Sequence, residues 1–273
     1  MHKAYKFRLY PTKEQATLMN KSIGCSRFVF NHFLAKWNET YKETGKGLTY
    51  HACAKLLTAL KKQFEWLKEV DAHSLQSSLR NLDDAFKRFF KKQNDAPRFK
   101  SKRNKVQSYT TKIEKKNQLP KVSIQGNKLK FPKLGWVKFA KSRKVEGRIL
   151  SATIRRNPSG KYFVSILCEM GSCPYVPVDK NKAVGVDLGL KDFAILSDGT
   201  KVKPSQFFRK YEQKLVYWQR IMSRRTKGGS NWQKARIKVA RIHEKIVNAR
   251  HDFLHKWSTK LIRENQTIAL EDL

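Results

Sequence analysis

The sequence predicts an α+β protein: an antiparallel β module with an inserted helical bundle, followed by a separate α/β domain. Three observations support this fold class. Apolar residues alternate with polar ones at the N-terminus and again after residue 121, which is typical of strands. Between these regions they recur at steps of three and four, which is typical of helices. After residue 182, short apolar strands are combined with two helical segments.

The chain is strongly basic. It has 273 residues, of which 59 are Lys or Arg and 22 are Asp or Glu, so its formal net charge is +37. Such an excess favours a polyanionic partner, and nucleic acid is the most common one. A ribosomal or membrane-surface protein is the alternative that charge alone leaves open. The 40% of hydrophobic residues excludes wholesale disorder.

No apolar run approaches the roughly 20 residues that cross a bilayer. The four cysteines form no Cys-x-x-Cys pair, so their spacing indicates neither a disulfide framework nor a zinc site. We therefore expect a protein of the reducing cytoplasm. The seven histidines form no evident metal pair, and no Walker loop is present, so a small-molecule nucleotide substrate has no support.

The N-terminal strand, residues 1–10, ends at Pro11, and Thr12 with Gln15 has the spacing of a helix capping box. Residues 11–94 then form the predicted helical insert. Its clearest helix has one apolar stripe, which we expect to face the core of the insert. The stripe consists of Leu75, Leu79, Leu82, Phe86 and Phe89.

A basic linker is expected over residues 95–120, where few apolar residues could support a core. Its cations surround Phe99, which favours phosphate contact over a merely solvated face. These candidate nucleic-acid-binding residues are Arg98, Lys100, Lys102 and Arg103.

Residues 121–178 return to a strand pattern with turn residues at Gly126-Asn127 and at Pro158-Ser159-Gly160. We expect two hairpins there. The N-terminal strand is expected to pair with them, so that residues 1–10 and 121–178 together form one β-barrel-like module.

The last predicted domain spans residues 182–273. A strand containing Asp187 is followed by a hairpin, a third strand, two helices and a final strand that ends at Glu271. Cations lie between the two helices and along the second, and they are further candidates for backbone phosphate contact. They are Arg224, Arg225, Lys227, Lys234, Arg236 and Arg241.

This order of elements is that of an RNase H-like fold, in which the first and fourth strands are neighbours in the sheet. Asp187 and Glu271 would then lie close together at one sheet edge. Two adjacent carboxylates repel unless a cation neutralises them, and Mg²⁺ or Mn²⁺ suits such oxygen ligands. Metal-dependent phosphodiester cleavage is the chemistry that this pair favours. The alternative is that Asp187 caps a turn and Glu271 is a solvated strand end.

Several motifs give the sequence a family resemblance. They are Tyr5-Lys6-Phe7-Arg8-Leu9-Tyr10-Pro11-Thr12, Pro97-Arg98-Phe99-Lys100-Ser101-Lys102, Val184-Gly185-Val186-Asp187-Leu188-Gly189-Leu190 and Leu270-Glu271-Asp272-Leu273. Over essentially its whole length the chain resembles the TnpB (OrfB) proteins of bacterial insertion sequences, which are transposase-associated relatives of the type V CRISPR effector nucleases.

The resemblance implies a RuvC-like, RNA-guided, Mg²⁺-dependent DNA endonuclease that takes part in transposition and DNA recombination near the bacterial nucleoid. Its partners would be a guide RNA and double-stranded DNA, with no membrane and no small-molecule substrate. Asp187 would match the first catalytic acid and metal ligand, and Glu271 the second. The surface that reads a short motif beside the target would lie in the helical insert, where Tyr50, Gln76 and Ser77 are the polar candidates.

The sequence departs from the family where it ends, at Leu273. Family members continue with further helix, with zinc-binding Cys-x-x-Cys motifs and with a third catalytic Asp, so an incomplete RuvC-like domain without the zinc ligands is expected. Cleavage by this chain is therefore left open. The alternatives are a non-catalytic protein that binds guide RNA and DNA, and a basic structural RNA-binding protein in which neither acid is used.

Overall fold

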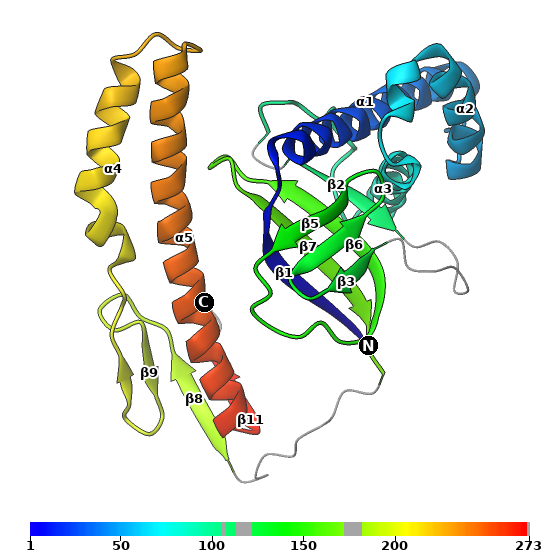
Figure 1. The fold of residues 1–273 in the computed structure, drawn as a ribbon. Coiled ribbons are helices and arrows are strands. Elements are labelled where there is room, and N and C mark those ends of the chain that lie inside the picture. Colours follow the sequence, from blue (N-terminus) through cyan, green and yellow to red (C-terminus); the bar gives the residue numbers. More distant parts are fainter. Residues whose placement is uncertain (105–106, 113–121, 172–181, 272–273) are drawn as a thin grey trace. The chain divides into compact units, whose positions relative to one another are not determined.

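The computed structural model describes residues 1–273 except 105–106, 113–121, 172–181 and 272–273. The chain divides into two compact units, Met1–Cys173 and Pro174–Leu273, which are described separately (Figure 1). Together they give the α+β class that the sequence predicts. No helix in the described ranges is both long enough and apolar enough to span a membrane.

The first unit is built on a seven-stranded antiparallel sheet with the strand order β2-β6-β7-β1-β5-β4-β3. Its strands are β1 (His2–Tyr10), β2 (Gln107–Lys112), β3 (Ser123–Gln125), β4 (Lys128–Phe131), β5 (Gly135–Phe139), β6 (Arg148–Arg156) and β7 (Tyr162–Glu169). The N-terminal strand lies in the middle of the sheet, paired with β7 and β5. Its alternating Tyr5, Phe7 and Leu9 are buried in the sheet core, which explains the period of two in the sequence.

Part of the segment expected as a linker is a strand instead. β2 pairs with β6 over its six residues, from Gln107 opposite Arg156 to Lys112 opposite Ser151. Its buried positions are Tyr109 and Thr111, which alternate as a strand requires. Only one of the two is a large apolar residue, so the hydrophobic pattern alone was too weak to indicate this strand.

The helical insert contains α1 (Lys13–Thr44), α2 (Tyr50–Gln63), a short 3-10 turn (Glu65–Lys68) and α3 (Ala72–Phe90). The predicted capping box is confirmed: Gln15 N donates to Thr12 Oγ1 at 3.2 Å and Thr12 N donates to Gln15 Oε1 at 3.1 Å. The α3 stripe is buried as predicted, except at its end. Phe89 is 37% exposed, because it lies in the last turn of the helix.

Asp71 joins the insert to the sheet. This buried residue is the N-cap of α3, where its Oδ1 accepts from His73 N at 3.2 Å. Its Oδ2 accepts from the hydroxyl of Thr111 in β2 at 2.8 Å. One carboxylate thus satisfies a free helix-terminal N–H group and fixes α3 against the sheet.

The second unit has a four-stranded sheet and two helices. Its elements are β8 (Ala183–Asp187), β9 (Ala194–Leu196), β10 (Lys201–Val202), α4 (Phe207–Ser223), α5 (Ser230–Glu264) and β11 (Thr267–Leu270). The strand order is β10-β9-β8-β11, and β11 runs parallel to β8. Val184, Val186 and Leu261 pack in one core, while α4 and α5 pack on each other through a second cluster of apolar residues.

Candidate functional site

The structure pairs the two strands at whose ends the predicted acids lie. β8 and β11 pair in parallel register, with Ile268 opposite Val184 and Leu270 opposite Val186. The next residues in this register are Asp187 and Glu271. Neighbouring strands lie about 4.8 Å apart, and paired positions project from the same face of a sheet. Both residues are exposed, so their carboxylates are open to a ligand from solvent.

Ser197 fixes the strand that carries Asp187. Its backbone N–H donates to the carbonyl of Gly185 at 2.9 Å, and its hydroxyl accepts from Gly185 N at 3.0 Å. Neither Asp187 nor Glu271 has an ion pair within the described ranges. Two unneutralised carboxylates in register are a donor set that fits a hard divalent cation. No cluster of three or more His, Cys, Asp or Glu suited to a metal occurs in the part of the chain described.

A basic loop, residues 98–104, is held firmly on the helical insert. The side chain of Asn31 in α1 makes two hydrogen bonds to the backbone of Lys100, accepting from its N–H at 2.8 Å and donating to its carbonyl at 2.9 Å. Gln107 in β2 holds the other end of the loop. Its Nε2 donates to the carbonyls of Ser101 at 3.0 Å, Lys102 at 3.4 Å and Asn104 at 2.9 Å. The loop is therefore preorganised.

The predicted cations of this loop have different surroundings. Arg98 pairs with Asp95 at 3.0 Å, but both side chains are strongly exposed, so the pair is weak. Lys102 and Arg103 are exposed and have no ion pair in the described structure. The ammonium of Lys100 lies 3.7 Å from the centre of the Phe30 ring. Desolvation there lowers the pKa of Lys100, although the rest of the side chain is exposed.

Replacing Asn31 with alanine is expected to release the basic loop. The variant loses both hydrogen bonds to Lys100, each contributing about 1 kcal/mol, so tryptic cleavage within the loop should be at least about tenfold faster. The rate of loop cleavage under native conditions is the measurement. Asn38→Ala, at an exposed position of the same helix, is the control. Equal cleavage rates for the two variants would show that Asn31 does not hold the loop in place.

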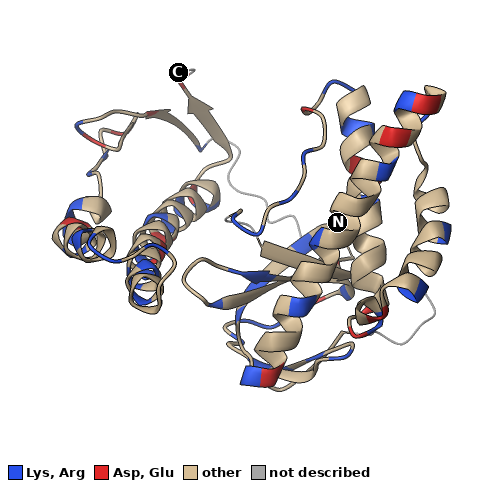
Figure 2. Ribbon diagram, turned by 90° about the horizontal axis from the view of Figure 1, so that it is seen from above, with Lys and Arg blue, Asp and Glu red and all other residues tan. Residues whose placement is uncertain are grey.

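The cations of the second unit form an exposed basic surface. Arg224, Arg225 and Lys227 lie in the turn between α4 and α5. Lys234 and Arg241 lie on one stripe of α5 that also includes Lys238 and Lys245, because steps of four, three and four residues keep one helical face. Arg236 is half-buried, where its Nε donates to Gln233 Oε1 at 3.0 Å. Lys and Arg are frequent on both helices (Figure 2).

Comparison with known proteins decides the family. A family model described as "Probable transposase" (OrfB, IS605) matches residues 165–273, and a "Helix-turn-helix domain" model of the same group matches residues 1–46. The chain is 36% identical over 278 residues to a "Putative RNA-guided DNA endonuclease" of Streptomyces pristinaespiralis, covering 99% of this chain and 67% of that protein. The chain belongs to the TnpB (OrfB) family.

A second TnpB relative is the "Putative RNA-guided DNA endonuclease InsQ" of Escherichia coli K12, which is 37% identical over 274 residues. That alignment covers 99% of this chain and 66% of InsQ, so the chain spans about two thirds of the length of these relatives. A CRISPR-Cas12f ternary complex aligns with a TM-score of 0.43 and 12% identity, over 96% of this chain and 64% of that one.

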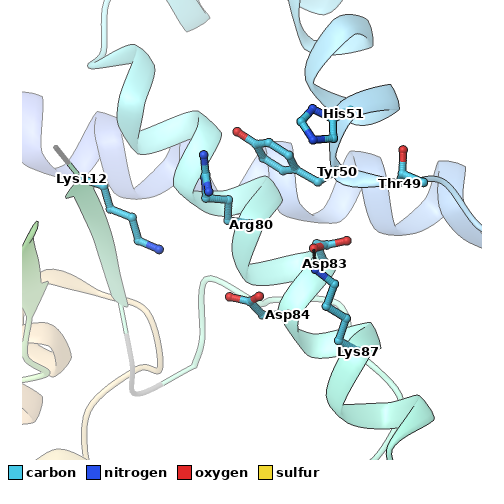
Figure 3. A pocket seen from close by; sticks show the side chains of 8 residues that line it. All are labelled: Thr49, Tyr50, His51, Arg80, Asp83, Asp84, Lys87 and Lys112. Atoms are coloured by element: carbon cyan, nitrogen blue, oxygen red, sulfur yellow. Dashed lines mark ion pairs between the residues drawn. The ribbon is translucent and has the colours of Figure 1, made fainter. Parts of the chain in front are cut away.

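The motif-reading candidates of this TnpB protein do not all share one surface. Tyr50 lines a cavity of about 440 Å³, and its ring lies 4.7 Å from the guanidinium of Arg80 (Figure 3). Gln76 is half-buried one helical turn before Arg80, and its Oε1 has no hydrogen-bond partner in the described structure. Ser77 is only 2% exposed and faces the core of the insert.

Sequence reasoning missed the residues that organise the site. Asn31 and Gln107 were not candidates, because each acts on a residue that is distant in the sequence. Asn31 and Lys100, for example, are 69 positions apart. Asn31 and Gln107 are uncharged amides, and such residues are too common in a sequence to indicate a site by themselves.

Proposed function

We propose that this TnpB protein is an RNA-guided DNA endonuclease whose second unit is an RNase H-like (RuvC-like) nuclease domain. The observation that supports this best is the parallel pairing of β8 with β11, because Asp187 and Glu271 are the next residues in that register. The names of two relatives at 36% and 37% identity describe the same activity. The partners would be a guide RNA and a double-stranded DNA target.

Asp187 and Glu271 would hold Mg²⁺ or Mn²⁺, which when bound activates water and stabilises the leaving oxygen of a phosphodiester. If the register of β8 and β11 continues by one residue, the two carboxylates would project from the same side of the sheet edge. The basic stripe of α5 and the cations of the α4–α5 turn would bind backbone phosphates near that edge of the same unit.

The first unit would bind nucleic acid through its basic loop, in which Lys102 and Arg103 are exposed. Tyr50 and Gln76, together with Arg80, would read the short motif beside the target. A tyrosine ring stacked on a guanidinium offers both an apolar face and hydrogen-bond donors to a base edge. Asp83 and Asp84 line the same cavity, and acids there would disfavour simple phosphate contact.

The test is cleavage by the chain purified together with its RNA. The protein is mixed with duplex DNA matched to that RNA, in Mg²⁺ or in EDTA. Cleavage only in Mg²⁺ is expected. Retained RNA without cleavage would instead support the second candidate, a non-catalytic protein that binds guide RNA and DNA. That candidate is favoured by the finding that the described residues contain no cluster of three or more His, Cys, Asp or Glu that could hold a metal ion. Failure to retain any defined RNA would contradict both.

A further inference from the structure

A second cavity lies beneath the basic loop. It has a volume of about 190 Å³ and is enclosed by α1, α3, β2 and the loop itself, all within the first unit. Its lining combines hydroxyl and amide groups with two cations, Arg27 and Lys100, and includes no carboxylate. In this respect it differs from the cavity beside Tyr50, which contains Asp83 and Asp84. The charge of the lining therefore favours an anion.

Arg27 and Lys100 are both held in place and both keep N–H groups that are free to donate hydrogen bonds to a ligand. Arg27 donates from Nη1 to Gln107 Oε1 at 2.9 Å, which uses one of the five N–H groups of a guanidinium. Lys100 is fixed through its backbone by Asn31. Its ammonium makes no ion pair in the described structure, and desolvation lowers the pKa of Lys100. An anion in the cavity would compensate that desolvation.

Ser26 is the observation that points to a ligand. It is 5% exposed, it lines the cavity, and its Oγ has no hydrogen-bond partner in the described structure. Buried hydroxyls are normally paired, and those nearby are. Ser22, one turn earlier on α1, donates to the carbonyl of Leu18 at 2.9 Å, and Ser78 on α3 donates to the carbonyl of Ser74 at 3.2 Å. Ser26 thus lacks the partner that its neighbours have.

We propose that this cavity binds one backbone phosphate of a nucleic acid, which accepts hydrogen bonds from Ser26 and Arg27 and pairs with Lys100. This inference takes the identity of the partner, a nucleic acid, from the proposed function. It adds the position at which that nucleic acid contacts the first unit. The loop, the insert and the sheet all contribute to the cavity. A phosphate bound there would therefore fix the register of the nucleic-acid strand relative to the first unit.

The test compares two serine variants of the full chain. Ser26→Ala removes an unpaired hydroxyl, so the melting temperature should stay the same or rise. The variant also loses the hydrogen bond from Ser26 to the charged phosphate, so its affinity for the nucleic acid should fall about tenfold. Ser22→Ala is the matched control, because it removes a hydroxyl that is already paired inside the protein. It should lower the melting temperature and leave the affinity unchanged.

Binding is read locally, from the amide NMR signals of Asn81, Asn104 and Gln107. The probes are a single-stranded DNA 12-mer, an RNA 12-mer of the same sequence, inorganic phosphate and an uncharged nucleoside. The proposal is supported if these signals shift with either polymer and with phosphate, and if Ser26→Ala but not Ser22→Ala weakens that binding. The polymer that binds more tightly identifies the source of the phosphate. Equal shifts with the nucleoside, or an unchanged affinity of Ser26→Ala, would overturn it. No guide or metal is needed, so failed cleavage would not affect this result.

Discussion

Replacing Asp187 with asparagine is expected to lower the rate of DNA cleavage by about a thousandfold. The variant keeps the size of the side chain but removes one of the two charges proposed to hold the metal at the β8–β11 edge. Metal assistance contributes several kcal/mol to phosphodiester cleavage, and each 1.4 kcal/mol corresponds to a tenfold change in rate. The affinity for RNA and DNA should be unchanged, because the cations proposed to bind phosphate are untouched. Single-turnover cleavage and an equilibrium binding assay measure the two effects.

A second readout does not depend on activity. Without a metal ion the two carboxylates repel, so Asp187→Asn should leave the melting temperature unchanged or raise it. Added Mg²⁺ should raise the melting temperature of the wild-type chain and not that of the variant. Asp252→Asn is the control, since it alters an exposed acid that pairs with Lys256 on α5. A loss of stability in Asp187→Asn without metal would show instead that Asp187 caps a turn.

The adjacency of the two strands beside the acids could be predicted because it follows from strand order. Asp187 ends one apolar strand and Glu271 follows another, and each strand is marked by local residues such as Val184 and Ile268. Local pattern decides where a strand lies, and general rules of topology then decide which strands are neighbours. Alternation also predicted that β1 pairs with the later strands, and it pairs with β7 and β5, whereas its central position in the sheet was not predicted.

The clamped loop and its cavity could not be predicted in this way. Their contacts join residues that are far apart, as in the hydrogen bond from Arg27 to Gln107 across 80 positions. Neither Arg27 nor Gln107 belongs to an apolar pattern that would reveal its position. A polar side chain can also form hydrogen bonds with many other residues. β2 was missed for a related reason: it is held by Thr111, which bonds to Asp71, as much as by its one large apolar residue. Polar contacts of this kind depend on a fold that already exists.

Replacing Gly147 with alanine is expected to destabilise the β module by about 2–5 kcal/mol. Gly147 has a φ of 84° and precedes β6, where Arg148 pairs with Glu169 of β7 at 2.7 Å. An L-residue in this conformation costs about 1–2 kcal/mol. The added methyl group would also overlap the backbone carbonyl of Glu169, which cannot rotate away without breaking the β6–β7 pairing. Forced backbone shifts of this kind cost about 1–3 kcal/mol more.

Gly160 provides a control that separates these two causes. It has nearly the same φ, 80°, but a methyl group there would meet nothing within 4 Å. Gly160→Ala should therefore cost only the conformational part, about 1–2 kcal/mol. Urea unfolding measures the free energies, and hydrogen exchange of the β6 and β7 amides localises the effect. If both variants lose the same stability, the close approach of Gly147 to Glu169 is not what requires glycine. If Gly147→Ala loses more stability than Gly160→Ala, the difference measures the cost of moving β6 away from β7, the strand between β6 and β1.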